Sequence, residues 1–250
     1  MARTVLTDNT WEQLQSTMKA HGCHTWKNDK QVMEAILWKL RTGAPWRDIP
    51  SELCPWKTAY NRFNRLSKKG LWEQFFFDLR ASIDEEWVFA DGSYIRCHQH
   101  SSGARRGELR ATGKSRGGTT TKIHLAVDSH GNPIDFRITG GDVHDSQAVD
   151  DIIEMLTDAT YFIADKAYDS ETIRTRLKQD NISPVIPKRK NAKQPDVAFD
   201  HYLYKLRHLV ENTFARLKHF RSIATRYEKL ARNYKSMLYL ACIMIHCKLN

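Results

Sequence analysis

The N-terminal third of the chain carries the apolar spacing of a helical module. Over about 28–41, apolar side chains recur every three or four residues, which places them on one face of a helix. Gly43 and Pro45 follow and would end that helix. Further helices are predicted to begin near Asp8 and to cover about 56–68 and 71–83. Since six of the seven tryptophans also lie here, we expect an aromatic-packed helical domain over residues 1–84.

Beyond residue 84 the pattern changes to short apolar runs of the kind that form strands. Strands are expected at 87–90, 119–128, 134–139, 161–164 and about 184–186, and helices at about 146–156, 170–179 and 202–220. Turn residues at 130–133 would join the second and third strands. This order predicts an α/β domain over residues 85–250, with a central mixed sheet and flanking helices.

Two of the apolar strands end in an aspartate, Asp91 and Asp165. A carboxylate at the end of a buried strand is held at the edge of the sheet, where α/β proteins place their sites. Either residue alone would more often begin a turn. Two matching units of strand and aspartate, followed by Glu211 on a basic helix, favour a functional group of three carboxylates.

The helix around Glu211 presents a second pattern. Tyr204, Arg207, Glu211 and Lys218 are spaced three, four and seven residues apart. At roughly 100° per residue they fall within an arc of about 60° on one helix face. The alternative is a solvated charged helix in which Arg207 and Glu211 form an ion pair across one turn.

A divalent cation would account for a cluster of three carboxylates. Three carboxylates close together repel and raise one another's pKa, and a cation relieves that repulsion. Mg²⁺ prefers oxygen ligands, and two such ions roughly 3.5–4 Å apart stabilise the attacking and leaving oxygens of a phosphodiester. The set Asp91, Asp165 and Glu211 therefore predicts magnesium-dependent chemistry on a phosphodiester.

The charge of the chain points to a polyanionic partner. The formal net charge is +10 and the hydrophobic fraction is 41%. Nucleic acid fits this charge, with an anionic membrane as the alternative. The longest apolar stretch, 237–245, is too short to span a bilayer and is expected to form a buried helix. A polar N-terminus and five scattered cysteines without a CxxC pair indicate a cytoplasmic protein.

Basic residues gather in two stretches. Nine Lys or Arg lie within 204–235, and seven lie within 96–122, where the glycine-rich segment 101–118 is expected to be a loop that orders on DNA. The helix over 56–68 could be the recognition helix of a helix-turn-helix, or part of a bundle that makes dimer contacts. The DNA-contact candidates are Arg62, Arg65, Arg105, Arg106, Lys122, Tyr204, Arg207, Lys218 and Arg221.

Several other polar residues are assigned structural roles. Cys97, His98 and His100 lack a second pair at zinc-finger spacing. Asp145 precedes a helix and is expected to be a cap or turn residue, and His124 is expected to be a satisfied core histidine. Asp128 is the main rival to Asp165, but the turn residues that follow it favour a position at the start of a hairpin.

The chain resembles the DDE transposases of bacterial insertion sequences, in the insertion-sequence-five family. Residues 204–218 match the signature Y-x₂-R-x₃-E-x₆-K at all four positions. Further matching segments are FADGS at 89–93, TTKIH at 120–124, GGDVHD at 140–145, DKAYDS at 165–170 and LRTGAPWRDIP at 40–50. One departure is Ala167, where the family would have glycine; alanine would tighten the turn after Asp165 if that position required a positive φ.

The resemblance implies an RNase H-like domain with a mixed five-stranded sheet. Asp91 would lie on the first strand, Asp165 just after the fourth and Glu211 on a late helix, and the three would hold Mg²⁺, with Mn²⁺ able to substitute. It also implies cleavage of double-stranded DNA at the terminal inverted repeats, followed by transfer of the freed 3′-hydroxyl into target DNA, in bacterial cytoplasm and by at least a dimer.

The resemblance also implies that Tyr204, Arg207 and Lys218 handle DNA near the cut, and their chemistry suits that role. Arginine grips phosphate with two hydrogen bonds, lysine binds it as a point charge, and a tyrosine ring stacks on an unpaired base. Two alternatives stay open. The first is a DNA-binding regulator or domesticated copy without catalysis, and the second is an RNase H-like nuclease without preference for transposon ends.

Overall fold

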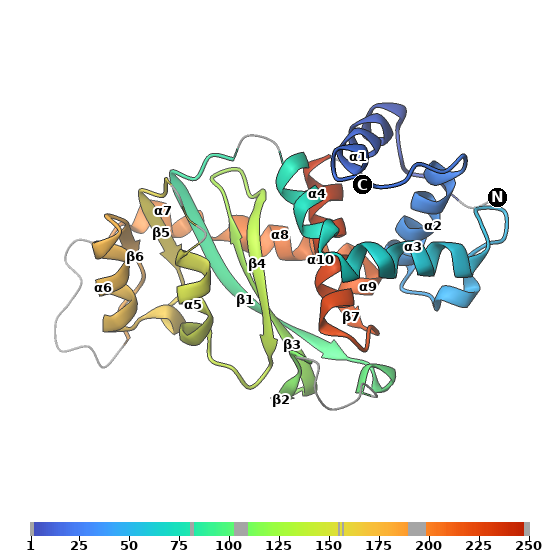
Figure 1. Cartoon of the computed structure of the whole chain (residues 1–250). Helices are drawn as coiled ribbons and strands as arrows, with labels where there is room; N and C mark the ends of the chain where they lie inside the picture. The colour runs from blue at the N-terminus through green and yellow to red at the C-terminus, as the bar shows by residue number, and fades with distance from the viewer. Residues whose placement is uncertain are drawn as a thin grey trace. The chain divides into compact units, whose positions relative to one another are not determined.

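A computed structural model describes residues 3–80, 83–102, 110–154, 156, 158–189 and 199–247 (Figure 1). The chain divides into two compact units. The first comprises Met1–Ala81, Cys97–Arg110 and Arg216–Asn250, and the second comprises Ser82–Arg96 and Ala111–Ala215. The first unit thus includes two segments beyond residue 84. Arg105 and Arg106 lie outside the described residues.

The first unit is helical. Its elements are α1 (Asp8–Ala20), α2 (Asp29–Thr42), η1 (Trp46–Asp48), α3 (Trp56–Lys68), α4 (Leu71–Leu79), η2 (Gln99–Ser102), α9 (Arg221–Ala224), β7 (Thr225–Arg226) and α10 (Ala231–His246). The predicted helices over 28–41 and 56–68 are confirmed as α2 and α3. Thr7 caps α1 by accepting a hydrogen bond from the Thr10 N–H, and α4 ends earlier than predicted, at Leu79.

Aromatic and aliphatic side chains form the core of this unit. Phe63, Trp72 and Phe75 are buried, and the Trp72 ring centroid lies 5.7 Å from that of Phe63. The apolar stretch at 237–245 is buried within α10, as expected, and the rings of Tyr239 and Phe76 lie 5.5 Å apart. Among the described residues, no helix combines the length and the apolar character that crossing a bilayer requires.

A buried ion pair also belongs to this core. The Arg62 side chain is 2% exposed, and its guanidinium lies 3.5 Å from the Asp29 carboxylate. It donates a hydrogen bond to the carbonyl of His24 and stacks over the ring of Trp26 at 4.8 Å. Because this guanidinium is buried and paired with Asp29 and His24 inside the core, we withdraw Arg62 from the set of DNA contacts.

The second unit is built around a mixed sheet. Its elements are β1 (Trp87–Cys97), β2 (Gly113–Ser115), β3 (Gly118–Val127), β4 (Pro133–Gly140), α5 (Asp145–Ile153), β5 (Tyr161–Ala164), η3 (Lys166–Tyr168), α6 (Glu171–Gln179), β6 (Ser183–Val185), α7 (His201–Lys205) and the first residues of α8 (His208–His219).

The strand pairing gives an RNase H-like sheet. β3 pairs antiparallel with both β1 and β4, and β1, β5 and β6 run parallel in that order. The five predicted strands therefore lie side by side in the order β4, β3, β1, β5, β6. The short strand β2 is an addition at the start of β3.

Three local predictions were wrong. The first strand continues through Asp91 to Cys97, because its antiparallel pairing with β3 extends as far as Arg96. The segment expected to be a loop over 101–118 contains β2, which pairs with β3. The long helix over 202–220 is two helices: α7 ends at Lys205 and α8 begins at His208, with i to i+3 backbone hydrogen bonds at Leu206 and Arg207.

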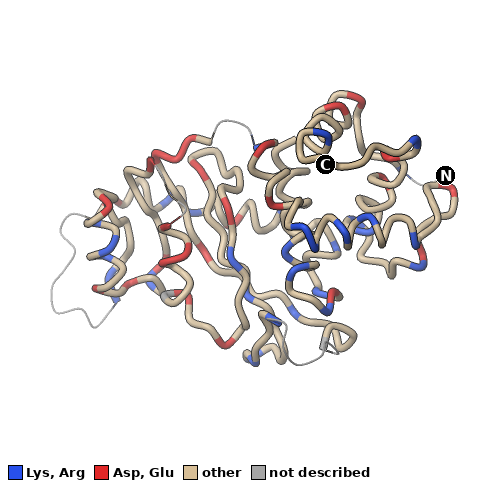
Figure 2. The backbone as a smooth tube through the Cα atoms, in the orientation of Figure 1, with Lys and Arg blue, Asp and Glu red and all other residues tan. Residues whose placement is uncertain are grey.

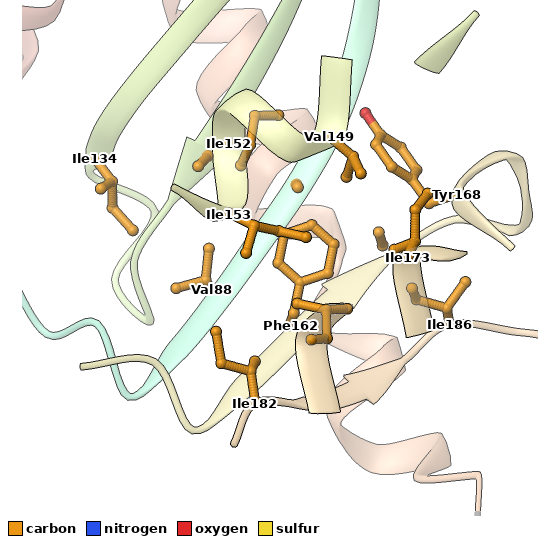
Figure 3. Close-up of a cluster of buried hydrophobic side chains, with 14 residues drawn as sticks. Val88, Ile134, Val149, Ile152, Ile153, Phe162, Tyr168, Ile173, Ile182 and Ile186 are labelled. Atoms are coloured by element: carbon orange, nitrogen blue, oxygen red, sulfur yellow. The ribbon is translucent and has the colours of Figure 1, made fainter. Parts of the chain in front are cut away.

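One face of the sheet is covered by α5 and α6. Its apolar core joins strand residues such as Val88 and Phe162 to Val149 of α5 and Ile173 of α6 (Figure 3). Tyr168, in η3, packs at the edge of this cluster and is fully buried. Because side chains alternate along a strand, residues 89 and 91 of β1 project to the opposite face.

A buried charge cluster connects β3 to α5. The Lys122 ammonium lies 2.6 Å from Asp145 Oδ2, and His124 Nδ1 lies 3.2 Å from Asp145 Oδ1. The other ring nitrogen of His124 bonds to the Thr139 hydroxyl at 2.8 Å. Burial works against ionisation of Asp145, but its contacts with His124 and Lys122 prevail and lower its pKa. Lys122 is thus a structural cation, so we withdraw it from the DNA contacts. Asp145 was expected to be a cap or turn residue, and it is also the counter-charge of the buried Lys122 ammonium.

We predict that Tyr168→Phe leaves the free energy of unfolding unchanged or raises it by up to about 1 kcal/mol. The Tyr168 hydroxyl is buried without a hydrogen-bond partner among the described residues, so its removal leaves no group unpaired. Urea denaturation measures the effect. The matched control is Tyr234→Phe, because the Tyr234 hydroxyl donates to the carbonyl of Ile223 at 3.0 Å and its loss should destabilise by about 1 kcal/mol. Equal losses in both variants would contradict the prediction.

Asp145→Asn is expected to destabilise the second unit by roughly 3 kcal/mol, because it leaves the buried Lys122 ammonium without a counter-charge. The pKa of Asp145 is lowered in the folded protein, so its stabilising effect is present at neutral pH. That effect is lost as the pH falls below the ordinary aspartate value of about 3.9. Denaturation at several pH values measures this difference. Asp180→Asn, at an exposed pair with Arg176, is the control and should change stability by less than about 1 kcal/mol. A similar loss in both variants would refute the role of Asp145.

Candidate active site

The parallel pairing of β1 and β5 determines where the first two carboxylates lie. Ala90 is opposite Ala164 in the register of these strands. Asp91 and Asp165 come directly after these two residues of the same chain, so both lie at the same end of the parallel pair of strands. Since both also follow the alternation of their strands to the same face, the fold brings together two residues that are 74 positions apart in the sequence (165 − 91).

Asp91 lies in a partly buried, negatively charged environment. Burial raises its pKa above the ordinary aspartate value, and the carboxylates of Asp165 and Asp145 add to that increase. The N–H of Gly92 donates to Asp91 Oδ1 at 2.7 Å, and this bond and Arg207 oppose the shift. A bound cation would favour the charged form of Asp91 in the same way.

Asp165 begins the short helix η3. Its carboxylate accepts a hydrogen bond of 2.8 Å from the Ala167 N–H, which fixes its orientation. Ala167 has no positive φ; among the described non-glycine residues, only Ala111 and Asn181 do. The turn after Asp165 therefore accommodates alanine without strain, and the departure from the family pattern does not disturb this carboxylate.

Arg207 links Asp91 to the third carboxylate. Its guanidinium lies 3.0 Å from Asp91 Oδ2 and forms a second ion pair with Glu211 Oε1. Burial lowers the pKa of Arg207, but Asp91 and Glu211 raise it by more, so the cation is stabilised here. The pair between Arg207 and Glu211 is the one a solvated helix would also form, whereas the contact with Asp91, across 116 residues, is not.

The arrangement therefore gathers three carboxylates around one guanidinium. Asp91 and Asp165 are adjacent, and Glu211 is joined to Asp91 through Arg207. Within the described part of the chain, no three side chains of His, Cys, Asp or Glu are already close enough to hold a metal ion. Glu211 has a side chain that is 51% exposed, so it is free to change rotamer. The donor chemistry of the site fits Mg²⁺, and the position of Arg207 is the part that would have to change.

The buried charge cluster lies directly beside this site. A Cβ atom on Gly92 would overlap with the Asp145 carboxylate, so Asp145 packs against the backbone next to Asp91. Burial raises the pKa of the nearby Tyr168 hydroxyl well above its ordinary value, and Asp145, Asp91 and Asp165 add to the increase. Sequence reasoning missed this role of Asp145, although its position in the segment matching the family was a usable signal.

Asp128 and His98, the other polar residues considered for the site, have structural roles. Asp128 accepts hydrogen bonds from the backbone of His130 and Asn132, at 2.9 and 2.7 Å, and so forms the hairpin turn as expected. His98 packs its ring on Tyr227 at 4.9 Å.

The remaining DNA-contact candidates differ in exposure. Arg65, Lys218 and Arg221 are exposed, and Tyr204 is half-buried with its ring 5.2 Å from that of Phe199. On α3, the exposed side chains of Lys57, Asn61, Arg65 and Lys68 recur every three or four residues and form one polar stripe. Figure 2 shows the basic residues gathered along this helix. Sequence reasoning also missed Arg96 and Arg116 as individual candidates, which are exposed and line one cavity with Tyr94.

Two family models match the chain. Residues 83–245 match the model described as Transposase DDE domain, and residues 6–76 match the model described as Putative transposase of IS4/5 family.

Individual relatives agree with these models. A putative transposase for insertion sequence element IS6501 of Brucella ovis is 34% identical over 127 residues, which cover 50% of this chain and 97% of the relative. A putative transposase for element IS402 of Burkholderia cepacia is 31% identical over 145 residues, covering 54% of this chain and 65% of the relative.

A more distant similarity connects the chain to a solved structure, the piggyBac transposase synaptic complex with hairpin DNA. The identity is 12% and the TM-score 0.38, over 77% of this chain and 46% of that one. At this TM-score the similarity has no bearing on function. The family models are sufficient by themselves: because the Transposase DDE domain model spans residues 83–245 of 250, the chain belongs to the DDE transposase family.

Proposed function

We propose that this transposase cleaves DNA at the ends of its own element and joins the freed 3′-hydroxyl to target DNA, with Asp91, Asp165 and Glu211 as the ligands of Mg²⁺. The observation that carries the proposal is the Arg207 guanidinium, which bridges Asp91 and Glu211 beside Asp165. A site that holds three carboxylates around one cation has the charge balance that divalent ions require.

Each residue has a separate task in this proposal. Asp91 and Asp165 are fixed by the sheet and by hydrogen bonds, so they form the rigid half of the metal site. Glu211, on an exposed helix face, completes it by turning away from Arg207. When bound, a pair of Mg²⁺ ions would stabilise the attacking and leaving oxygens of the phosphodiester.

Arg207 would exchange its partners when DNA arrives. Its guanidinium is 22% exposed and paired with two carboxylates, and a phosphate offers it the same bidentate geometry. With Glu211 turned to the metal, Arg207 is released to hold a phosphate next to the scissile bond. Tyr204, one turn earlier, would stack on a base beside the cut.

Other cationic side chains would hold the flanking duplex. We assign this role to Lys218, Arg221 and the α3 stripe with Arg65, together with Arg96 and Arg116, because all of these are exposed. Arg105 and Arg106 stay candidates on sequence grounds. A multimer of at least two chains is proposed on family grounds.

A regulator without catalysis is the second candidate. It is favoured by the ion pairs of Arg207, which occupy the position that a metal would need. Such a protein would bind element ends and leave them uncut, whatever the metal.

We expect Asp91→Asn, Asp165→Asn and Glu211→Gln each to reduce end cleavage roughly a thousand-fold, because bound metal supplies several kcal/mol of transition-state stabilisation. Binding of the same DNA in EDTA should survive. A labelled duplex carrying the sequence that flanks the gene, incubated with Mg²⁺ or Mn²⁺ and separated on a denaturing gel, measures cleavage and joining. Asp180→Asn is the matched surface control. Cleavage by any of the three variants at the rate of the parent chain would exclude that carboxylate from the metal site. Uncut DNA with the parent chain would favour the regulator.

For Arg207→Ala we predict opposite effects on metal binding and on cleavage. Without the competing guanidinium, the carboxylates should bind Mn²⁺ about fivefold more tightly, equivalent to the roughly 1 kcal/mol of a partly exposed ion pair. Cleavage should fall, because the phosphate loses its bidentate partner. Calorimetric titration of Mn²⁺ and the gel assay measure the two quantities. The control is Arg176→Ala, which breaks an exposed ion pair on α6. Weaker Mn²⁺ binding by Arg207→Ala would contradict the exchange of partners.

A further inference from the structure

The first unit contains a cavity of about 920 Å³ that the chemistry of the carboxylates does not use. Segments from α2, η1, α3 and the stretch between β7 and α10 line it. Figure 1 labels α2, α3, β7 and α10. The lining residues that matter are Lys39, Trp46, Tyr60, His98, Tyr227 and Asn233. The volume is within the range of about 300–1,000 Å³ that small-molecule sites occupy.

The walls of the cavity are aromatic and held in place by other rings. Trp46 meets Tyr60 edge to face at 5.6 Å and lies 5.2 Å from the buried ring of Phe63. Tyr227 lies 4.9 Å from His98, with the two ring planes tilted by 34°. Tyr227 is nevertheless 38% exposed, so part of its ring is available to a ligand. Planar aromatic walls of this kind stack on flat heterocycles.

Lys39 sets the charge of the cavity. Its side chain is 3% exposed, and its ammonium lies 3.2 Å from the Ser222 hydroxyl and 3.7 Å from Glu228. The same ammonium lies 5.9 Å from the ring centre of Trp46 and 6.0 Å from that of Tyr227. The aromatic cage thus already contains its own cation, which is paired with the Glu228 carboxylate that also lines the cavity. This disfavours a cationic ligand and favours an uncharged, electron-rich one.

Two buried polar atoms in the lining lack a partner. Asn233 is 4% exposed, and neither its Oδ1 nor the Trp46 indole N–H has a hydrogen-bond partner among the described residues. A buried acceptor or donor without a partner is destabilising, so a ligand that pairs with it is favoured. An asparagine amide offers a donor and an acceptor side by side, which match the edge of a nucleobase.

The rim carries exposed cations suited to phosphate. Lys229 lines the cavity and is exposed. Arg221 is exposed as well, and its Cβ lies 3.1 Å from where a side chain on Gly43 would begin. Gly43, which has φ +69° and closes α2, therefore allows Arg221 to approach this wall.

We propose that this cavity binds a nucleobase unstacked from a DNA strand, with Tyr227 and Trp46 as stacking surfaces, Asn233 reading the base edge and Lys229 and Arg221 holding the adjoining phosphates. The proposal rests on the proposed function in one respect, that DNA is the partner of the chain. It adds a site for a single unpaired base in the first unit, separate from the carboxylates and from Tyr204 in the second.

A fluorescent base tests this site directly. The probe is a single-stranded dT oligonucleotide with one central 2-aminopurine, whose fluorescence is quenched on stacking, titrated with the full chain in EDTA. The same oligonucleotide in a duplex, and free 2-aminopurine deoxynucleotide, are separate arms. We expect quenching with the single strand, weaker binding of the duplex and little binding of the free nucleotide, which lacks the flanking phosphates.

Substitutions in the cavity show whether the quenching arises from a base bound there. Tyr227→Ala and Asn233→Ala should each weaken binding of the single strand about tenfold, as loss of one stacked base does, whereas Tyr227→Phe should bind like the parent chain. Tyr227 is partly exposed, so Tyr227→Ala should keep the melting temperature. Asn233 is buried, so the melting temperature of Asn233→Ala is measured beside its binding to separate loss of contact from loss of folding. Phe77→Ala, at another partly exposed ring of the same unit, is the matched control and should leave binding unchanged.

The outcomes separate this proposal from the catalytic one. Parent-like binding by Tyr227→Ala and Asn233→Ala, or an equal loss in Phe77→Ala, would overturn the assignment of the cavity. Free nucleotide binding as tightly as the oligonucleotide would overturn its assignment to a DNA strand. The Asp91→Asn variant should quench the 2-aminopurine fluorescence like the parent chain, because the titration in EDTA does not depend on the metal site. If the carboxylate variants abolish cleavage while the cavity variants bind the single strand like the parent chain, the proposed function is supported and the base-binding site is excluded.

Discussion

Two partly buried carboxylates placed side by side repel each other, and the structure around them is organised to tolerate that repulsion. The register of β1 and β5 places Asp91 next to Asp165, and burial raises the pKa of Asp91. Arg207 supplies the opposing charge, while backbone N–H groups hold each carboxylate in place. Replacing a buried ion cluster by apolar residues is often neutral or stabilising, so this group of charges supports the metal site proposed above.

The basic character of the chain has two different origins. Part of the positive charge is exposed, as on the α3 stripe, and is available to phosphate. Another part is buried and paired, as in Arg62 with Asp29, Lys122 with Asp145 and Lys39 with Glu228. These buried cations stabilise the core or line a cavity, and their number does not measure DNA affinity. Net charge alone therefore indicates the class of partner but not the residues that contact it.

The sequence predicted the parts of the fold that depend on local pattern. The helices over 28–41 and 56–68 and the strand at 161–164 follow directly from apolar spacing and from glycine or proline at their ends. It failed where long-range pairing decides the outcome. β1 continues past the Asp91-Gly92 step because β3 supplies hydrogen bonds to it, and the helix around Arg207 breaks at the residue that reaches Asp91. The role of Asp145 was hidden for the same reason, since its partners Lys122 and His124 come from another strand.

The most direct test of the account is anomalous diffraction from crystals of the full chain soaked in Mn²⁺, which locates the metal independently of activity. The account predicts manganese in contact with the carboxylates of Asp91 and Asp165, and Glu211 turned away from Arg207 to complete the coordination. Manganese bound elsewhere, or Glu211 still paired with Arg207 while the two aspartates hold no metal at saturating concentration, would contradict it.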